Sequence, residues 1–451
     1  MIDWLFEHLG RNRSAGAVGT PGRTHTYGEL LDTIQARIED LARIDVTPGT
    51  VASLEGDYGA DSIACFLALA ARGAIIVPIS SDAARSRDDF LEIAEVELRV
   101  SPSTGELRRT GRAASHALHQ RLRERQHAGL VLFTSGSTGT HKAAVHDLTA
   151  LLEKFKVARN CYRTLVFLQI DHIGGVNTLF YTLSNGGMSV VPRDRSPDGV
   201  CQSIEEHRVE LLPTSPTFLN LLLLSNASTR YDISSLRLVT YGTEPMPEST
   251  LARLSAAFPH AELQQTYGST EFGILRSKSR GRDSLWVRVG GEGYETKVID
   301  GRLWVRSKSA MLGYLNAPSP FDADGFLDTG DLVESDGEWL RILGRRSEVI
   351  NVGGSKVHPA EVESVLLALD NVTDACVRGE PHPIVGQIVT ATVRLASAER
   401  PAEFRARMRS FCMERLEPYK VPARVTLSDQ PLYSQRYKRV RKAGPIEEGA
   451  S

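Results

Sequence analysis

Apolar and polar positions follow two periodicities in the first part of the chain. From Thr26 to Leu41 the apolar residues recur at a helical spacing, and residues 63–71 show the same pattern. Short, mostly apolar runs at 51–54 and 73–79 predict buried strands. Helices that alternate with buried strands are typical of a mostly parallel sheet with helices on its faces.

This alternation continues to about residue 245. Further strands are predicted at 130–133, 165–168, 190–192, 211–213 and 236–240, and further helices at 173–180 and 219–224. Residues 101–128 are polar and basic and are expected at the surface. The first half of the chain is therefore predicted to be α/β.

The pattern changes after Gly281. Residues 286–289, 295–299 and 303–306 alternate between apolar and polar positions, with Asp300-Gly301 as a tight turn, which predicts antiparallel strands and a small β-barrel-like portion. Residues 322–331 are rich in Asp and Gly and are expected to form a loop. A break at Gly344–Ser347 precedes a compact mixed α+β segment, so the predicted domains are 1–345 and a small mobile unit at 346–451.

Composition limits the possible functions. The chain has 451 residues, which is too long for one core, and a net charge of -2, which favours neither nucleic acid nor a membrane surface. The five cysteines are scattered without metal or redox spacing, and no apolar run suits a signal peptide or a bilayer span. These features predict a cytoplasmic protein with a small-molecule substrate.

One stretch has the composition of a phosphate-binding loop. The apolar strand at 130–133 leads directly into small hydroxyl residues and glycines that end in one lysine. Glycines allow close backbone approach, and amides, hydroxyls and a lysine together attract an anion. The predicted phosphate-binding residues are Thr134, Ser135, Gly136, Ser137, Thr138, Gly139 and Lys142. Two residues separate Gly139 from Lys142, so this is not a Walker A loop; a flexible linker is the alternative.

Two further motifs suit a nucleotide site, although each is weak by itself. Tyr267-Gly268-Ser269-Thr270-Glu271 combines an aromatic ring, hydroxyls and a carboxylate that can hold Mg²⁺. Thr329-Gly330-Asp331 offers a carboxylate on a turn, which can accept from both hydroxyls of a ribose. Ordinary turns are built from the same residue types.

Ten segments, in order along nearly the whole chain, resemble the adenylate-forming (AMP-binding) superfamily of acyl-CoA synthetases, aryl-acid ligases, luciferases and peptide-synthetase adenylation domains. These segments are THTYGEL, ALAARGAIIVPIS, FTSGSTGTHK, HIGGVNTLFYTLSNGG, YGTEPM, YGSTEFG, GRLWVRSKSAMLGYL, GFLDTGDL, GRRSEVINVGGSKVHPAEVE and LEPYKVP. An ordered series is far more specific than any single motif.

The resemblance implies a two-step reaction. A carboxylate attacks the α-phosphate of ATP and releases pyrophosphate, and a thiol of CoA or a phosphopantetheine carrier protein then takes the acyl group. Such chemistry depends on positioning and charge neutralisation. By motif match, Thr270 would contact the α-phosphate, Glu271 would bind Mg²⁺, and Lys438 would be the catalytic tail lysine.

The resemblance also assigns roles to the remaining site residues. The nucleotide would be held by Gly242, Thr243, Glu244, Tyr267, Gly268, Ser269, Asp331 and Arg345. Gly242 and Tyr267 would enclose adenine, and Asp331 and Arg345 would hold the ribose. Gly353 and Gly354 would line the thiol tunnel.

The resemblance places the acid-binding pocket around the segment that begins at His172. The pocket would be built from His172, Ile173, Gly174, Asn177, Tyr241 and Gly268. His172 coincides with an aromatic or histidine position at the pocket mouth; alternatively it is a packed loop residue. Peptide-synthetase domains carry an aspartate where this chain has Ile173, and an unpaired ammonium beside isoleucine is costly, so an aryl or medium acyl acid is expected rather than an α-amino acid.

The tail and hinge depart from the family pattern. Ser347 stands where aspartate or lysine is common, and Tyr437-Lys438 replaces the usual Gly-Lys, with Arg436 and Lys442 close enough to leave the register open. The tail could instead be a solvated basic stretch. Two alternative functions therefore remain: adenylation of an oxyanion such as nitrite for aryl-amine diazotisation, and non-catalytic nucleotide binding.

Overall fold

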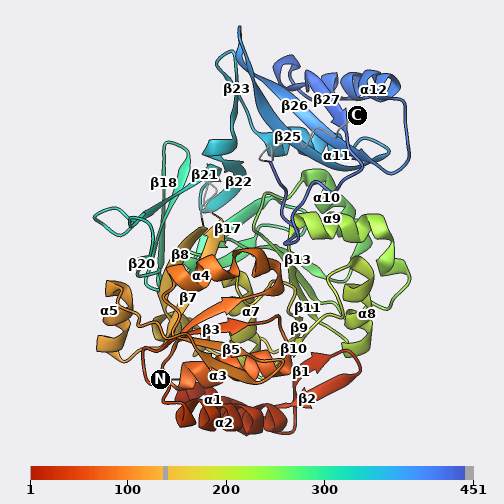
Figure 1. Cartoon of the computed structure of the whole chain (residues 1–451). Coiled ribbons are helices and arrows are strands. Elements are labelled where there is room, and N and C mark those ends of the chain that lie inside the picture. The colour runs from red at the N-terminus through yellow and green to blue at the C-terminus, as the bar shows by residue number, and fades with distance from the viewer. Residues whose placement is uncertain (1, 136–140, 442–451) are drawn as a thin grey trace, which may run out of the picture.

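The structure is a computed structural model that describes residues 2–135 and 141–441, with the side chain of Ser135 excepted. Within this range it is built from five sheets, most of them covered by helices (Figure 1). The N-terminal helices lie at one end of the molecule and the C-terminal unit at the other (Figure 1).

Two seven-stranded sheets form the bulk of the structure. The order in the first is β13 (Glu262–Gln265), β12 (Leu238–Tyr241), β11 (Leu211–Thr214), β9 (Arg163–Leu165), β10 (Met188–Val190), β1 (Gly16–Thr20) and β2 (Arg23–Thr26). The order in the second is β20 (Gly313–Tyr314), β8 (His141–Asp147), β7 (Gly129–Ser135), β4 (Ile75–Ile79), β3 (Val51–Glu55), β5 (Leu98–Ser101) and β6 (Glu106–Arg109). Except for the antiparallel strands β2, β6, β8 and β20, the strands pair in parallel, as the apolar runs predicted.

Helices cover both sheets. They are α1 (Asp3–Arg11), α2 (Tyr27–Arg43), α3 (Ala60–Ala71), α4 (Arg87–Ile93), α5 (Ala117–Arg125), α6 (Leu148–Leu152), α7 (Ile173–Ser184), α8 (Pro197–His207), α9 (Pro216–Ser225) and α10 (Glu248–Ala257), with short 3-10 turns η1 (Ser81–Ser86), η2 (Glu153–Phe155) and η3 (Ala227–Thr229). The helix predicted from Thr26 begins with a capping box, in which Thr26 and Glu29 satisfy each other's backbone amides. Leu30, Phe66 and Leu179, from α2, α3 and α7, belong to one buried cluster that also includes strand residues of both sheets.

A third, six-stranded sheet is antiparallel. Its order is β16 (Arg276–Ser279), β17 (Trp286–Gly290), β22 (Trp339–Arg345), β21 (Leu327–Asp336), β19 (Arg302–Ser307) and β18 (Tyr294–Ile299), and a separate pair joins β14 (Gly268–Ser269) to β15 (Gly273–Ile274). The predicted turn is present, because Asp300 and Gly301 have φ of 49° and 71°, as a type I′ hairpin turn requires.

Three sequence predictions are corrected here. Residues 327–331 are not loop: they begin β21, because β19 and β22 pair with this segment on either side, and Gly330 adopts the φ of 72° that the segment needs there. The strands predicted at 165–168 and 190–192 are β9 and β10, which end at Leu165 and Val190.

The C-terminal segment forms a separate unit with its own apolar core. Its sheet contains β24 (Ser355–Val357), β23 (Ile350–Val352), β26 (Gly386–Leu395), β25 (Val372–His382) and β27 (Arg424–Leu427), covered by α11 (Pro359–Leu367) and α12 (Pro401–Met413), with η4 (Arg346–Glu348) before it and η5 (Pro418–Lys420) within it. The fold class predicted from the sequence is therefore confirmed. The boundary between Arg345 and Arg346 stays a prediction.

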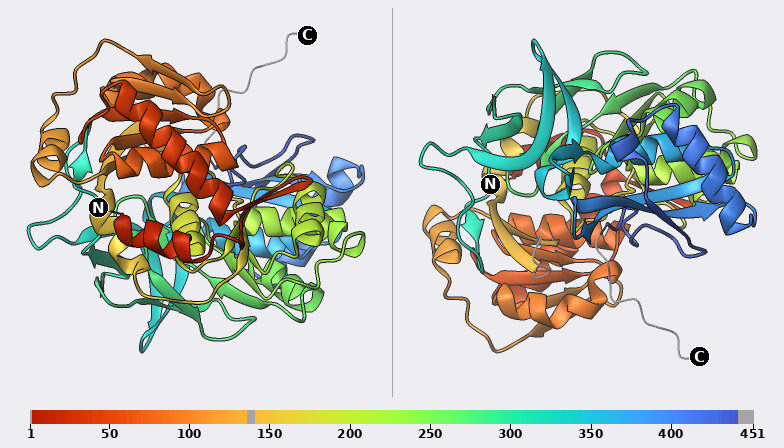
Figure 2. Two further views of the ribbon diagram at one scale, coloured as in Figure 1. Left: turned by 90° about the horizontal axis from the view of Figure 1, so that it is seen from below. Right: turned by 90° about the horizontal axis from the view of Figure 1, so that it is seen from above.

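The C-terminal unit rests on α9 and α10, as the view from above shows (Figure 2). The Asn220 side chain donates to the carbonyl of Thr373 at 2.9 Å. Ser364 of α11 accepts from the Glu248 amide at 3.1 Å and, through its carbonyl, from the Ser249 hydroxyl at 3.1 Å. These contacts fix the pose in which the chain's tail approaches the larger unit.

Candidate active site

The tail carries Lys438 into the larger unit on a tight turn. The Ser434 amide donates to the Lys438 carbonyl at 2.8 Å, and the Val440 amide donates to the Leu432 carbonyl at 3.0 Å. Lys438 Nζ lies 3.2 Å from His172 Nε2. The structure thus brings together two predicted site residues that are 266 positions apart in the sequence.

His172 is held by the start of α7. Its Nδ1 accepts from the Gly174 amide at 3.1 Å and caps the helix. The other ring nitrogen, Nε2, faces Lys438. Burial, followed by the positive charges of Lys438 and Arg436, lowers the pKa of His172 well below its usual value.

The amine of Lys438 is also perturbed. Burial, with the nearby charge of Arg436, lowers its pKa to about 8, and the carboxylate of Glu244 opposes that shift. The side chain therefore changes charge much closer to neutral pH than an exposed lysine does.

Tyr437 fixes the backbone directly before Lys438. Its φ of 52° is a left-handed conformation that glycine adopts more easily. Its ring packs against Phe167 and Phe218, with centroids 5.5 and 5.3 Å away, and its hydroxyl donates to the Arg195 carbonyl at 2.6 Å. These contacts hold a tyrosine in a conformation that is unfavourable for it.

Lys142 and Glu271 meet through Tyr314. The Tyr314 hydroxyl donates to Glu271 Oε1 at 2.6 Å, and Lys142 Nζ lies 5.3 Å from the centre of the Tyr314 ring. Lys142 sits on β8, opposite Thr134 of β7. The predicted residues Gly136, Ser137, Thr138 and Gly139 lie outside the described residues, as does the side chain of Ser135.

Tyr267, Asp331 and Arg345 form a second group. The Tyr267 hydroxyl donates to Asp331 Oδ2 at 2.6 Å, and Arg345 Nε lies 3.7 Å from Asp331 Oδ1. Burial raises the pKa of Asp331, although the bond from Tyr267 and the charge of Arg345 oppose that shift. Arg345 is 64% exposed, so its guanidinium is open to a ligand.

The loop after β12 is closely packed. A side chain at Gly242 would place a carbon 2.6 Å from the Thr266 hydroxyl, so the backbone there admits only glycine without movement. Thr243 has a φ of 74°. The carboxylate of Glu244 accepts from the Thr217 amide at 2.8 Å and the Arg439 amide at 3.1 Å, which joins α9 to the tail.

Gly268, Ser269 and Thr270 belong to the β14–β15 hairpin. A side chain at Gly268 would meet the Gly273 carbonyl at 2.6 Å, and the Ser269 hydroxyl accepts from the Glu271 amide at 3.2 Å. Thr270 lies in the turn of this hairpin.

The predicted pocket residues lie at the start of α7 and on β12, except Gly268, which lies on β14. Ile173 and Tyr241 are buried, Gly174 begins α7, and the side-chain oxygen of Asn177 accepts from Lys154 at 2.7 Å. Lys154 also donates to the Ile274 carbonyl at 3.1 Å, and burial lowers the pKa of this lysine to about 7.

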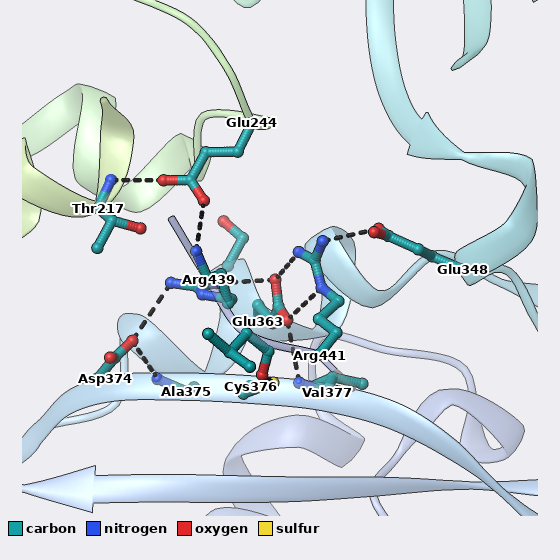
Figure 3. A network of polar contacts seen from close by, with 12 residues as sticks. Thr217, Glu244, Glu348, Glu363, Asp374, Ala375, Cys376, Val377, Arg439 and Arg441 are labelled. Carbon is teal, nitrogen blue, oxygen red and sulfur yellow. Dashed lines mark hydrogen bonds and ion pairs between the residues drawn. The ribbon is translucent and has the colours of Figure 1, made fainter. Parts of the chain in front are cut away.

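The arginines that follow Lys438 are not solvated. Arg439 donates to Glu363 at 2.7 Å and to Asp374 at 3.3 Å, and Arg441 contacts Glu363 and Glu348, each at 2.7 Å (Figure 3). The side chains of Arg439 and Glu363 are only 7% and 1% exposed. The interpretation of this segment as a solvated basic tail is therefore wrong for residues 439 and 441.

Several contacts in the site could not be read from the sequence. Asp171, Arg436, Tyr314, Lys154 and Glu363 take part through tertiary contacts alone. Tyr314 and Glu363 lay inside quoted motifs and Arg436 lay in the basic tail, and these were the only available signals. Gly353 and Gly354 lie on the β23–β24 hairpin, where the Gly353 amide donates to the Val385 carbonyl at 2.8 Å.

The residues present suit a metal ion that is held partly by the protein and partly by the substrate. Among the described residues, no group of three or more His, Cys, Asp or Glu side chains could hold an ion. Mg²⁺ commonly takes one or two carboxylates and completes its shell with phosphate and water, so Glu271 fits that requirement. Within the same residues no helix has the length and apolarity needed to cross a bilayer.

This chain is similar to known proteins over most of its length. The family model described as AMP-binding enzyme matches residues 86–315, and that of the AMP-binding enzyme C-terminal domain matches residues 361–434. The 2-succinylbenzoate–CoA ligase of Bacillus cytotoxicus is 27% identical, over 94% of this chain and 94% of its own. That of Bacillus velezensis is 31% identical, over 65% of this chain and 63% of its own.

A solved structure, an anthranilate CoA ligase in complex with anthranoyl-AMP, has a TM-score of 0.79 at 20% identity and covers 96% of this chain and 95% of its own. The matches to three curated relatives span only 59, 63 and 67% of their lengths. Since the AMP-binding enzyme model covers just over half of the sequence and the C-terminal model follows it in order, the chain belongs to the adenylate-forming (AMP-binding) superfamily of ATP-dependent ligases.

Proposed function

We propose that this chain activates a small carboxylic acid as its acyl adenylate, with ATP and Mg²⁺, and then transfers the acyl group to a thiol. The observation that carries the proposal is the contact of Lys438 with His172 at the start of α7.

The chain's own residues would divide the work. The cation of Lys438 stabilises negative charge that develops between carboxylate and α-phosphate; one such preorganised donor is typically worth about 10²–10³ in rate. Lys142 would neutralise phosphate charge, and Thr270 would contact the α-phosphate. Glu271, oriented by Tyr314, would hold Mg²⁺, which supplies charge neutralisation when bound.

Nucleotide recognition would use the second group. Asp331 would accept from the ribose hydroxyls, with Arg345 beside it, and the ring of Tyr267 and the backbone at Gly242 would enclose adenine.

The acid is proposed to be aryl or medium acyl. Ile173 is 2% exposed and offers no partner for an α-ammonium group. Curated relatives named as 2-succinylbenzoate–CoA ligases, and a fold neighbour named as an anthranilate CoA ligase, support an aryl acid with CoA as acceptor. A carrier protein is the second possible acceptor. We also propose that the protein works in the cytoplasm.

The test is pyrophosphate release with ATP, Mg²⁺ and a panel of aryl, medium acyl and α-amino acids, followed by mass spectrometry after CoA is added. We expect turnover with an aryl or medium acyl acid and formation of its CoA thioester. Lys142→Ala should weaken ATP binding, and Glu271→Gln should abolish turnover. Release of pyrophosphate only with nitrite and an aminoarene would replace this proposal by the diazotase, and ATP binding without turnover would indicate a non-catalytic relative.

A further inference from the structure

A buried ion pair joins the candidate site to the tail beside the Lys438–His172 contact. Arg436 Nη2 lies 2.8 Å from Asp171 Oδ2. Asp171 immediately precedes His172, and Arg436 is two residues before Lys438. The Asp171 side chain is 6% exposed and that of Arg436 is 32% exposed, so the contact is largely shielded from solvent.

Asp171 has few other partners. Its Oδ2 accepts from the Ser80 hydroxyl at 2.6 Å and from the Ser80 amide at 3.4 Å. Its other oxygen, Oδ1, is buried without a hydrogen-bond partner in the described part of the chain. If the tail left, a buried carboxylate would keep only one serine, and an uncompensated buried charge is costly.

The position of Arg436 determines that of Lys438. Only Tyr437 separates them, and its ring, hydroxyl and carbonyl are all engaged with the larger unit, the carbonyl accepting from the Ser215 hydroxyl at 2.8 Å. Asp171 also supplies negative charge beside Arg436 and Lys438, two cations that would otherwise repel each other. The ion pair therefore both locates the lysine and offsets the repulsion of placing it there.

We infer that Asp171 and Arg436 are positioning residues that hold the tail in the adenylation pose, and that their ion pair must break before acyl transfer to the thiol. The inference rests on the proposed function, in which the C-terminal unit takes a different pose for each half-reaction. The strength of this ion pair would then set the rate of adenylate formation relative to the rate of acyl transfer.

The kinetic test separates the half-reactions in Asp171→Asn, Arg436→Gln and the double variant. Adenylate formation is followed by pyrophosphate release with the best acid of the panel, and transfer by reaction of the pre-made acyl adenylate with CoA. We expect kcat for adenylate formation to fall by roughly 10- to 100-fold in each single variant, and no further in the double variant, because both lose one interaction. Transfer should be unchanged or faster, and KM for ATP should change little.

Arg424→Gln is the matched control, since it removes an arginine of the C-terminal unit that is 71% exposed and pairs with Glu380 of the same unit. It should leave both half-reactions unchanged. An equal loss in adenylation and transfer, or additive losses in the double variant, would overturn the inference by showing a merely structural role.

Trypsin offers a readout that needs no turnover. Lys438 lies 3.2 Å from His172 of the larger unit, so cleavage after Lys438 requires that the tail leave that unit. Asp171→Asn should raise the cleavage rate after Lys438 several-fold, whereas Arg424→Gln should not. A rate equal to the parent's would refute the positioning role even if no acid is ever turned over, whereas absence of turnover alone would refute only the proposed function.

Discussion

At the scale of single residues, Lys438 has an unusual charge environment. It is partly buried beside Arg436 and lies 3.2 Å from His172 Nε2, and its pKa falls to about 8. Below that pH the side chain is a cation in the pose shown by the structure, and above it the charge is lost.

The proposed chemistry therefore predicts a pH dependence. For adenylate formation, kcat/KM should fall as pH rises through about 8, because the free enzyme loses the ammonium of Lys438. Lys438→Arg, which stays charged, should lose this fall even if its rate is lower. A stopped-flow pH series of pyrophosphate release would measure both, and an unchanged fall in Lys438→Arg would assign it to another group.

The contact between Tyr314 and Glu271 predicts an effect on Mg²⁺ binding. The Tyr314 hydroxyl orients the Glu271 carboxylate, so Tyr314→Phe should raise the Mg²⁺ concentration for half-maximal turnover by about 10-fold, as loss of an outer partner of a metal ligand commonly does. A Mg²⁺ titration of pyrophosphate release measures this. Tyr419→Phe, on an exposed tyrosine, is the control, and equal titrations for all three proteins would separate Tyr314 from metal binding.

Sequence motifs named many residues that the structure brings together, but not their partners. Lys438 and His172, or Tyr267 and Asp331, could be paired from motif order because each belongs to a recognisable segment. Asp171 and Arg436 could not, since a carboxylate and an arginine far apart in sequence carry no signal that they will meet. Their contact depends on how two units dock, which no local pattern encodes.

At the scale of secondary structure, α11 depends on one buried carboxylate. Although burial alone would raise the pKa of Glu363, the charges of Arg439 and Arg441 bring it down to about 2. Because the pKa of Glu363 is lowered on folding, its ionised carboxylate stabilises the folded state at pH values above the unfolded-state pKa, near 4.5. This stabilisation is lost as the pH falls toward 2. The shift corresponds to about 3 kcal/mol of stability at neutral pH.

Glu363→Gln should therefore destabilise the C-terminal unit by about 3–5 kcal/mol, because two buried arginines lose their shared carboxylate. Denaturant unfolding at pH 7 measures the loss. Glu361→Gln, on the same helix but 40% exposed and paired with Lys420, should change stability by less than about 1 kcal/mol. Equal effects from the two substitutions would show that the buried network adds little.

Local patterns predicted most elements because their periodicities were clear. The capping box at Thr26 and the Asp300-Gly301 turn are short-range features that sequence reveals directly. Residues 327–331 were misjudged, since their Asp and Gly content favours a loop while pairing with β19 and β22 makes them strand. Tertiary pairing overrode local composition there.

At the scale of the whole molecule, the two units meet through α9, α10 and the tail. If the units rotate between half-reactions, the segment around η4 must change its backbone angles. Ser347→Pro, which restricts φ, should slow acyl transfer to CoA and spare adenylate formation. Single-turnover measurements of both steps test this, with Ser347→Ala as control; equal slowing of both steps would indicate misfolding rather than restricted rotation.

The buried contacts of Arg439 and Arg441 determine how Lys438 reaches its target. Because these arginines are bound to Glu363 and Asp374, the segment after the lysine is part of a folded unit rather than a loose chain end. A group on a flexible tether samples a large volume and has an effective concentration in the millimolar range. Lys438 is instead confined near His172 whenever the units dock, so its effective concentration there depends on domain docking and changes almost as a single step.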